Sequence, residues 1–149
     1  MATERGLPRW IRPANRLVRA MSGAGMRMGT IVVLTVPGRV SGQPRSTPVA
    51  PLTVDGHRYV VAGLPGGDWA RNVRAAGQGM LSAGRKRQEV TFTEVADQDT
   101  REQVMRAFPK QVRGGVPLLV QLGVVHGPDP NEFAAAAGKV AIFEVLPAT

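Results

Sequence analysis

Two short runs rich in β-branched residues, 31–36 and 48–54, most strongly limit how this chain can fold. Runs of this length and composition predict β-strands rather than helices. They are joined by the link Gly38-Arg39-Val40-Ser41-Gly42-Gln43-Pro44-Arg45, so the chain enters a second strand soon after the first. Taken alone, this link is an ordinary turn sequence, because Gly, Pro, Ser and Gln are all common in turns.

The same link is also suited to an anion. Glycine lets backbone N–H groups turn outward, and arginine offers a planar fork that matches phosphate or carboxylate. The link is not a Walker loop, because no Gly-Lys-Ser/Thr follows and no helix begins there. It is not a dinucleotide fingerprint either, since it opens a strand. In this context it predicts an anion-binding loop whose anion belongs to a cofactor.

Further short elements are predicted along the rest of the chain. Asp55-Gly56 is a hairpin signal before a strand at residues 58–62. A helix is expected from Asp68, as its N-cap, to Gly77. The other expected elements are strands at 80–83, 88–95 and 140–145, a helix at 97–108 closed by Pro109, an apolar segment at 116–122, and a helical patch at 134–137. Many short strands with antiparallel turns predict a mainly β (α+β) barrel.

Composition narrows the chemistry. The chain of 149 residues has no cysteine, which excludes disulfides and thiolate catalysis. His57 and His126 are too few for a metal site, so we expect no metal. There is no Ser-His-Asp or His-Glu-x-x-His pattern, and we assign no catalytic side chain. The lack of a nucleophile favours an enzyme whose chemistry belongs to its cofactor.

The formal net charge is +8, and most of the basic residues lie in the first 90 positions. Such a surface attracts an anionic cofactor, an anionic lipid surface or nucleic acid. Aromatic residues are few and no recognition-helix pattern is present, so we expect no nucleic-acid partner.

Arginines also mark the N-terminus, at helical spacing opposite an apolar stripe: Arg5, Arg9, Arg12, Arg16 and Arg19. This predicts a basic amphipathic N-terminal segment at residues 1–28, before a barrel domain at 29–149. Residues 5–21 either cover one end of the barrel or associate weakly with anionic membrane. No apolar run is long enough to span a bilayer and no signal peptide is evident, so we expect a cytoplasmic protein, peripheral at most at the inner membrane face.

The loop 38–45 is followed by a second strand, a Gly-rich loop at 63–67 and a helix carrying Trp69-x-x-Asn72. This order resembles the deazaflavin (coenzyme F-420)-dependent nitroreductase family of actinobacteria, over roughly residues 29–145. The resemblance implies an antiparallel, Greek-key-like split β-barrel that binds coenzyme F-420, also written F420, with flavin mononucleotide (FMN) as the alternative. It implies hydride transfer to an electron-poor small molecule such as a quinone, an enone or a nitro compound.

The resemblance also implies which residues bind the cofactor. The matching positions are Arg39, Ser41, Gly42, Gln43, Arg45, Thr47, Pro48, Ala62, Gly63, Trp69 and Asn72. Those of the 38–45 loop would hold the phosphate and the tail, and the others would lie near the ring. For Trp69, packing in the core is an equally good explanation. For Asn72 the alternative is a cap or a surface amide, although asparagine inside a helix is mildly unfavourable.

Two departures from the family pattern affect the expected affinity for the cofactor or the choice of cofactor: Val40 stands where many relatives have lysine, and Leu64-Pro65 where some have Ser-Lys. A third departure affects the expected substrate. Residues 109–130 contain no tyrosine, and an aliphatic stretch at 116–120 offers a pocket wall or a piece of core. This third feature favours lipophilic quinone-like or unsaturated acceptors over nitroaromatic ones. A non-catalytic cofactor-binding or lipid-binding protein at the membrane surface is the alternative from another class.

Overall fold

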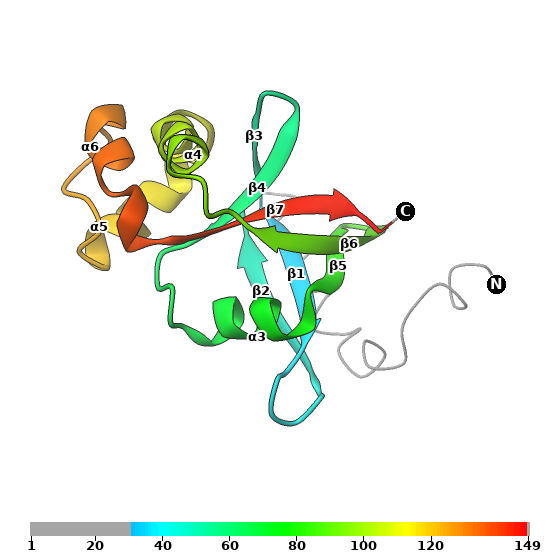
Figure 1. Ribbon diagram of the computed structural model, residues 1–149. Coiled ribbons are helices and arrows are strands. Elements are labelled where there is room, and N and C mark those ends of the chain that lie inside the picture. The colour runs from blue at the N-terminus through cyan, green and yellow to red at the C-terminus, as the bar shows by residue number, and fades with distance from the viewer. Residues whose placement is uncertain (1–30, 149) are drawn as a thin grey trace.

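The computed structural model describes residues 31–148, which build one curled sheet of seven strands (Figure 1). The strands follow the spatial order β2-β1-β5-β6-β7-β4-β3, and all neighbours run antiparallel. Their bounds are Val32–Pro37 (β1), Pro44–Val49 (β2), Leu52–Val54 (β3), His57–Ala62 (β4), Gln78–Ala83 (β5), Lys86–Glu94 (β6) and Ala141–Pro147 (β7). The expected mainly β fold, a split barrel with short helices, is confirmed.

The helices gather in two places. Their bounds are Asp68–Ala76 (α3), Gln98–Gln111 (α4), Val116–Gln121 (α5) and Pro130–Ala135 (α6), with 3-10 turns at Arg113–Gly115 (η2) and Ala137–Lys139 (η3). Figure 1 shows α4, α5 and α6 grouped at one end of the sheet, whereas α3 lies apart from them and packs near β1.

Strand β7 separates two apolar cores. Ala141, Phe143 and Val145 face the inner core, which α3 helps to close, whereas Ile142 faces the core under α4 and α6. Successive side chains of a strand point to opposite faces, so this strand is buried on both sides. That burial explains the apolar run from Ala141 to Phe143, and each large side chain buried there contributes roughly 1.5–3 kcal/mol.

The Asp55-Gly56 hairpin is confirmed. Both residues have positive φ, 51° and 79°, and Val54 pairs with His57 across the turn. A two-residue turn of this kind matches the twist of its strands only with positive φ at both central positions, which Asp and Gly tolerate.

The second strand was predicted wrongly. Residues 48–54 do not form one strand. Strand β2 begins earlier and ends at Val49, and β3 begins only after Pro51. Strand β2 lies at the edge of the sheet, where prolines are tolerated because one side needs no N–H donor. The turn between β1 and β2 therefore shortens to residues 38–43, and Arg45 and Thr47 lie on a strand.

Two predicted helix ends were also wrong. Gly67, not Asp68, is the N-cap of α3, and it makes no side-chain capping bond. Pro109 does not close α4, which continues to Gln111. A proline this near a C-terminus removes only one hydrogen bond before the helix would end anyway. Gly77 does end α3 in the left-handed conformation, with φ of 68°, as predicted.

The remaining predicted segments fall close to the observed elements. Asp97 caps α4, since its carboxylate accepts a hydrogen bond from the Thr100 backbone N–H at 2.9 Å. The apolar segment 116–122 forms α5, and the patch 134–137 spans the end of α6 and the start of η3.

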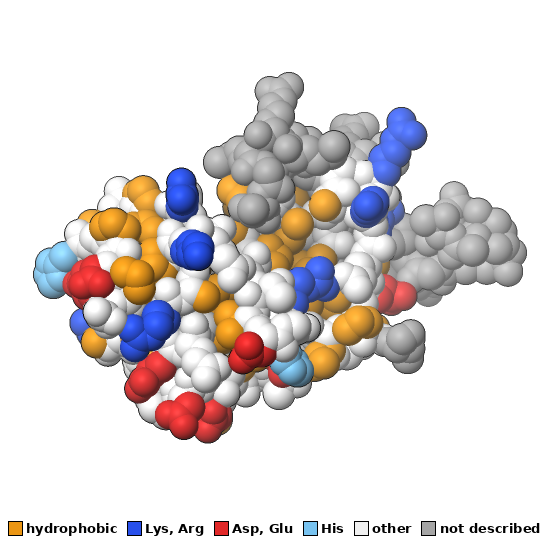
Figure 2. Space-filling view, turned by 90° about the horizontal axis from the view of Figure 1, so that it is seen from above, with side chains coloured by type: hydrophobic (Ala, Val, Ile, Leu, Met, Phe, Trp, Pro, Cys, Tyr) orange, Lys and Arg blue, Asp and Glu red, His pale blue; other side chains and the backbone are white. Residues whose placement is uncertain are grey.

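The predicted N-terminal segment 1–28 and the proposed membrane contact at 5–21 lie outside the described residues. Between residues 31 and 148, no helix is both long enough and apolar enough to cross a bilayer. The face seen in Figure 2 carries scattered basic side chains, some of them beside acidic ones, so the net positive charge is not gathered there as one continuous patch.

Candidate functional site

A cavity of about 660 Å³ opens where the β1–β2 hairpin, the loop at residues 63–67, the start of α3 and the end of α5 meet. Its polar lining comes from the hairpin and α3, namely Arg39, Ser41, Arg45, Ser46, Thr47, Asp68 and Asn72. Its large apolar side chains are Leu34, Val36, Val40, Leu64, Trp69, Leu118 and Leu122. The cavity thus joins segments that are distant in the sequence.

Asn72 and Arg39 form the polar centre of this lining. The Asn72 side-chain oxygen accepts hydrogen bonds from the Arg39 backbone N–H at 3.1 Å and from Arg39 Nη1 at 2.8 Å. Because both neighbours are donors, the oxygen end of the amide must face Arg39. The Asn72 Nδ2 group makes no hydrogen bond to any residue between 31 and 148, so it is available to a ligand. Asn72 is only 5% exposed.

Arg39 is therefore a tether between the hairpin and α3. Its Nη2 also reaches Asp68 Oδ1 at 3.3 Å, and its Nη1 reaches the Asp68 carbonyl at 3.4 Å. The Asp68 side chain is 90% exposed, so this second contact is weak. Much of the hydrogen-bonding capacity of the Arg39 guanidinium is therefore used by its contacts with Asn72 and Asp68.

Arg45 differs from Arg39 in this respect. It pairs with Val36 across β1 and β2, and Thr47 pairs with Leu34, so both side chains lie on the face of the sheet that lines the cavity. Within the described part of the chain, the Arg45 guanidinium has no hydrogen-bond or ion-pair partner. It is the cation of the lining that is most available to a bound anion.

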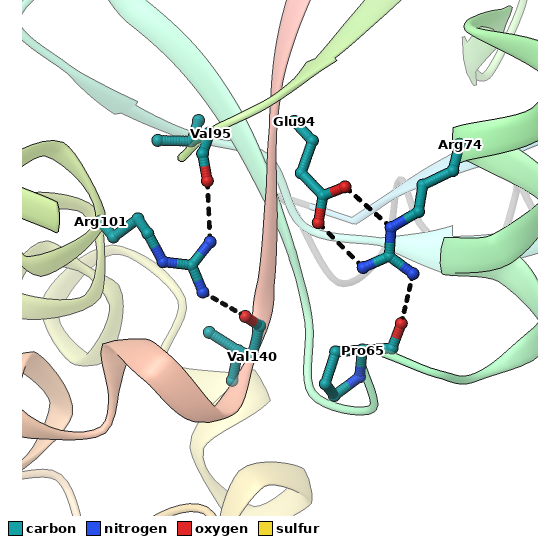
Figure 3. Close-up of polar contacts among 6 residues, drawn as sticks. All are labelled: Pro65, Arg74, Glu94, Val95, Arg101 and Val140. Carbon is teal, nitrogen blue, oxygen red and sulfur yellow. Dashed lines mark hydrogen bonds and ion pairs between the residues drawn. The ribbon is translucent and has the colours of Figure 1, made fainter. Parts of the chain in front are cut away.

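The loop at residues 63–67 is held by Arg74 of α3 (Figure 3). Arg74 Nη1 donates to the Pro65 carbonyl at 2.6 Å, while Nε and Nη2 each donate to the Glu94 carboxylate at 2.8 Å. The hydrogen bond from Arg74 lowers the pKa of Glu94 below its ordinary value, and the same bond raises the pKa of Arg74. Because both side chains are more than one third exposed, the pair adds little to stability, and its geometric effect on the loop matters more.

Gly63 fits α5 closely. An added Cβ at Gly63 would lie 2.7 Å from Leu119 Cδ2 and 2.7 Å from Leu122 Cδ1. The family resemblance implied that Gly63 lies near the cofactor ring. The structure shows that this glycine also makes room for two leucines of the α5 region.

Trp69 lies at the boundary between the cavity and the inner core. It lines the cavity and also packs beside Phe143 of the inner core, with ring centroids 6.2 Å apart. Its fluorescence can therefore report on a ligand bound in the cavity.

The structure brings most of the predicted site residues together. Those that line the cavity are Arg39, Ser41, Arg45, Thr47, Gly63, Trp69 and Asn72. Gly42 and Gln43 are exposed in the hairpin turn, Pro48 is exposed on β2, and Ala62 is buried in the inner core; none of these four lines the cavity.

The sequence analysis missed two features of the site. Asp68 binds Arg39 instead of capping the helix, and the Arg74–Glu94 pair supports the 63–67 loop. No local pattern marks the second feature, because its partners lie 20 positions apart on different elements.

The donor set of the cavity fits an anionic, ring-bearing cofactor. It combines a guanidinium and an amide N–H₂ group that have no partner among residues 31–148 with small hydroxyl side chains, beside an aromatic and aliphatic surface. Asp68 is the only carboxylate among the described lining residues, and none of them is His, Cys or Tyr. Nor do three or more potential metal ligands gather anywhere in residues 31–148.

Solved structures of similar fold support the split barrel. A conserved hypothetical protein of Mycobacterium tuberculosis, Rv2991, aligns at a TM-score of 0.55 and 13% identity, covering 87% of this chain and 79% of its own. A putative pyridoxamine 5′-phosphate oxidase of Listeria innocua aligns at 0.54 and 12% identity, covering 88% and 94%. An F420-H2 dependent reductase (FDR-A) shares 21% identity over 78% of this chain and 94% of its own, at a TM-score of 0.49, which is too low to argue a shared fold.

The sequence itself was also compared with known families. No match was found among curated proteins. The family described as F420H(2)-dependent quinone reductase matches residues 10–115, most of the chain. This confirms the predicted F420-dependent enzyme, and the flavin mononucleotide alternative gains no support. The chain belongs to the F420H(2)-dependent quinone reductase family and is an F420-dependent reductase.

Proposed function

We propose that this protein reduces a quinone with coenzyme F420 held in the cavity beside the β1–β2 hairpin. The observation that carries the proposal is the lining itself. It offers Arg45 and the Asn72 amide as unused donors, next to aliphatic side chains from α5 and the 63–67 loop. One part of the cavity therefore suits an anionic cofactor, and another suits an apolar acceptor.

Three residues would hold the anionic groups of the cofactor. Arg45 supplies a charge-assisted hydrogen bond, which is about twice as strong as a neutral one. Arg39 adds positive charge while remaining fixed by Asn72, and Thr47 adds a hydroxyl group from the same strand as Arg45. Because Arg39 is already ordered, little conformational entropy is lost when a ligand binds there.

The protein contributes position rather than acid–base chemistry. Reduced F420 supplies a hydride, and a quinone that accepts this hydride together with one proton from water becomes a hydroquinone. Asp68, the carboxylate of the lining, is exposed and paired with Arg39, so solvent is the proton source. Holding the two reactants face to face accounts for most of the rate gain expected of such a site.

A quinone is the acceptor class that we favour over an enone or a nitro compound, because the matched family is described as a quinone reductase. The side chains next to the polar lining include Leu64, Leu118 and Leu122. An acceptor with a lipophilic part matches such a surface by area burial.

Fluorescence and absorbance together test the proposal. In a Trp10→Phe variant, Trp69 is the only tryptophan, and oxidised F420 should quench it saturably at micromolar concentration whereas flavin mononucleotide should not. Oxidation of reduced F420 should then depend on both the protein and menadione. Quenching by flavin mononucleotide alone, or no menadione-dependent turnover by protein that binds F420, would contradict the proposal.

We propose further that residues 5–21 give weak association with anionic membranes. The spacing of their arginines opposite an apolar stripe supports this. Deleting residues 1–12 should abolish co-sedimentation with anionic vesicles and leave the affinity for F420 unchanged. Persistent sedimentation of the truncated protein would contradict the assignment.

A further inference from the structure

Helix α5 exposes apolar side chains on the side that its core contacts do not use. Leu119 is 3% exposed, whereas Leu118 and Leu122, at the end of the helix, are 55% and 37% exposed. A short helix with one buried face normally carries polar residues on the other. Over residues 116–122 only Gln121 is polar, so the outer side of this segment has the composition of a contact surface.

The exposed leucines lie at the cavity. Leu118 and Leu122 both line it and are four residues apart, so they are neighbours on one face of the helix. Leu64, 56% exposed, lines the cavity from the 63–67 loop. We call Leu64, Leu118 and Leu122 the leucine lip. Val120 lies on the same helix at 38% exposure but does not line the cavity.

We infer that the leucine lip binds an uncharged aliphatic chain carried by the acceptor, where that chain leaves the cavity. The inference rests on the proposed function, since the acceptor ring must first enter the cavity. The lip has no charged member and residues 116–122 carry no charge, so a neutral alkyl or prenyl chain complements it better than an acidic or basic peptide.

The expected gain in affinity follows from area burial. Full burial of one methylene group raises affinity about fourfold, and half burial on an open surface raises it about twofold. Each added methylene should therefore lower KM about twofold until the chain extends beyond the lip. With five or six methylenes covered, the total is roughly 30- to 60-fold.

The experiment uses 1,4-naphthoquinones whose alkyl chain at carbon 2 lengthens from methyl to octyl, without detergent or vesicles. KM should fall with chain length while kcat changes little, because the chain binds equally well in the ground state and the transition state. A second measurement needs no cofactor: the same quinones should quench Trp69 in the Trp10→Phe protein, with dissociation constants that follow the same trend.

Matched variants separate the lip from general hydrophobicity. In the double variant Leu118→Ser with Leu122→Ser, the fall in KM from methyl to octyl should be at least tenfold smaller than in the parent. Its affinity for F420 should be unchanged. Val120→Ser tests the same helix outside the cavity. Leu146→Ser tests a leucine of β7 with the same 37% exposure as Leu122, also outside the cavity. Both controls should keep the full chain-length dependence.

The outcomes distinguish this inference from the proposed function. If menadione is reduced but neither KM nor Trp69 quenching depends on chain length, the inference that the leucine lip binds the chain is wrong, and the proposed quinone reduction stands. If menadione is not reduced but long-chain quinones quench Trp69 in a manner that needs Leu118 and Leu122, the chain site stands without the function. A chain-length effect that appears only after vesicles are added would overturn the inference, because the bilayer would then be holding the chain.

Discussion

Arg39 and Arg45 lie in the same sequence motif, but the structure predicts that their replacement has different consequences. The Arg39 guanidinium donates to the buried Asn72 oxygen at 2.8 Å, whereas Arg45 is exposed and has no partner within residues 31–148. Arg39→Gln should therefore lower both stability and F420 affinity, and Arg45→Gln should lower only affinity. The sequence alone predicts the same effect for both.

The magnitudes follow from the contacts. A hydrogen bond to a charged group contributes about 1.5–3 kcal/mol when well buried. The Arg39 side chain is 25% exposed and its contacts to Asp68 are long, so we expect a loss of about 1–2 kcal/mol. This corresponds to a fall in Tm of roughly 3–8 °C for a domain of this size. Exposed substitutions such as Arg45→Gln stay within about 0.5 kcal/mol.

The binding side is measured by Trp69 quenching in the Trp10→Phe background. Loss of the Arg45 cation should weaken F420 binding about tenfold at low salt, and less as salt screens the charge. Arg85→Gln, a matched exposed arginine in the β5–β6 turn, should change neither property. The reasoning is refuted if Arg45→Gln lowers Tm as much as Arg39→Gln, or if its F420 affinity stays within twofold of the parent.

Two further predictions concern the loop at residues 63–67. Gly63→Ala places a methyl group 2.7 Å from Leu119 and Leu122, and α5 must shift because Leu119 is buried. We expect chemical denaturation to show a loss of about 1–2 kcal/mol in stability, together with a higher KM for long-chain quinones. Unchanged stability would show that the contact is not tight. Glu94 has a lowered pKa in the folded protein, so its pairing with Arg74 stabilises the fold above pH 4.5 and is lost as the pH falls below that value. Because the pair is exposed and adds little to stability, Glu94→Gln should have a Tm only about 1–2 °C lower at pH 7 and equal to the parent near pH 3. A gap that persists in acid would assign the effect to another group.

Local rules account for the elements that the sequence predicted well. The Asp55-Gly56 turn depends on positive φ at two adjacent residues, and the end of α3 depends on Gly77 alone. Both signals act over a few residues and need no knowledge of the remaining fold. The predicted boundary at Pro109 failed because proline rules describe helix interiors, and α4 was already close to its end.

From the sequence, the site could be predicted only as a motif, that is, as certain residue types in a certain order along the chain. The resemblance placed Arg39, Arg45, Trp69 and Asn72 near one cofactor, and the structure gathers them around one cavity. It could not show that Asn72 immobilises Arg39, whereas Arg45 has no partner among residues 31–148. That division depends on how α3 packs against the hairpin, which the sequence between them does not encode locally.

The sequence by itself determined most of the strands, the tight turns, the absence of thiol chemistry and the motif that resembles the family. Each of these depends on composition or on residues only a few positions apart. The tertiary structure alone decided that α5 meets Gly63 and that Arg74 supports the 63–67 loop through Glu94. These contacts join segments tens of residues apart, and their geometry exists only once the curled sheet has set the distances between its strands and helices.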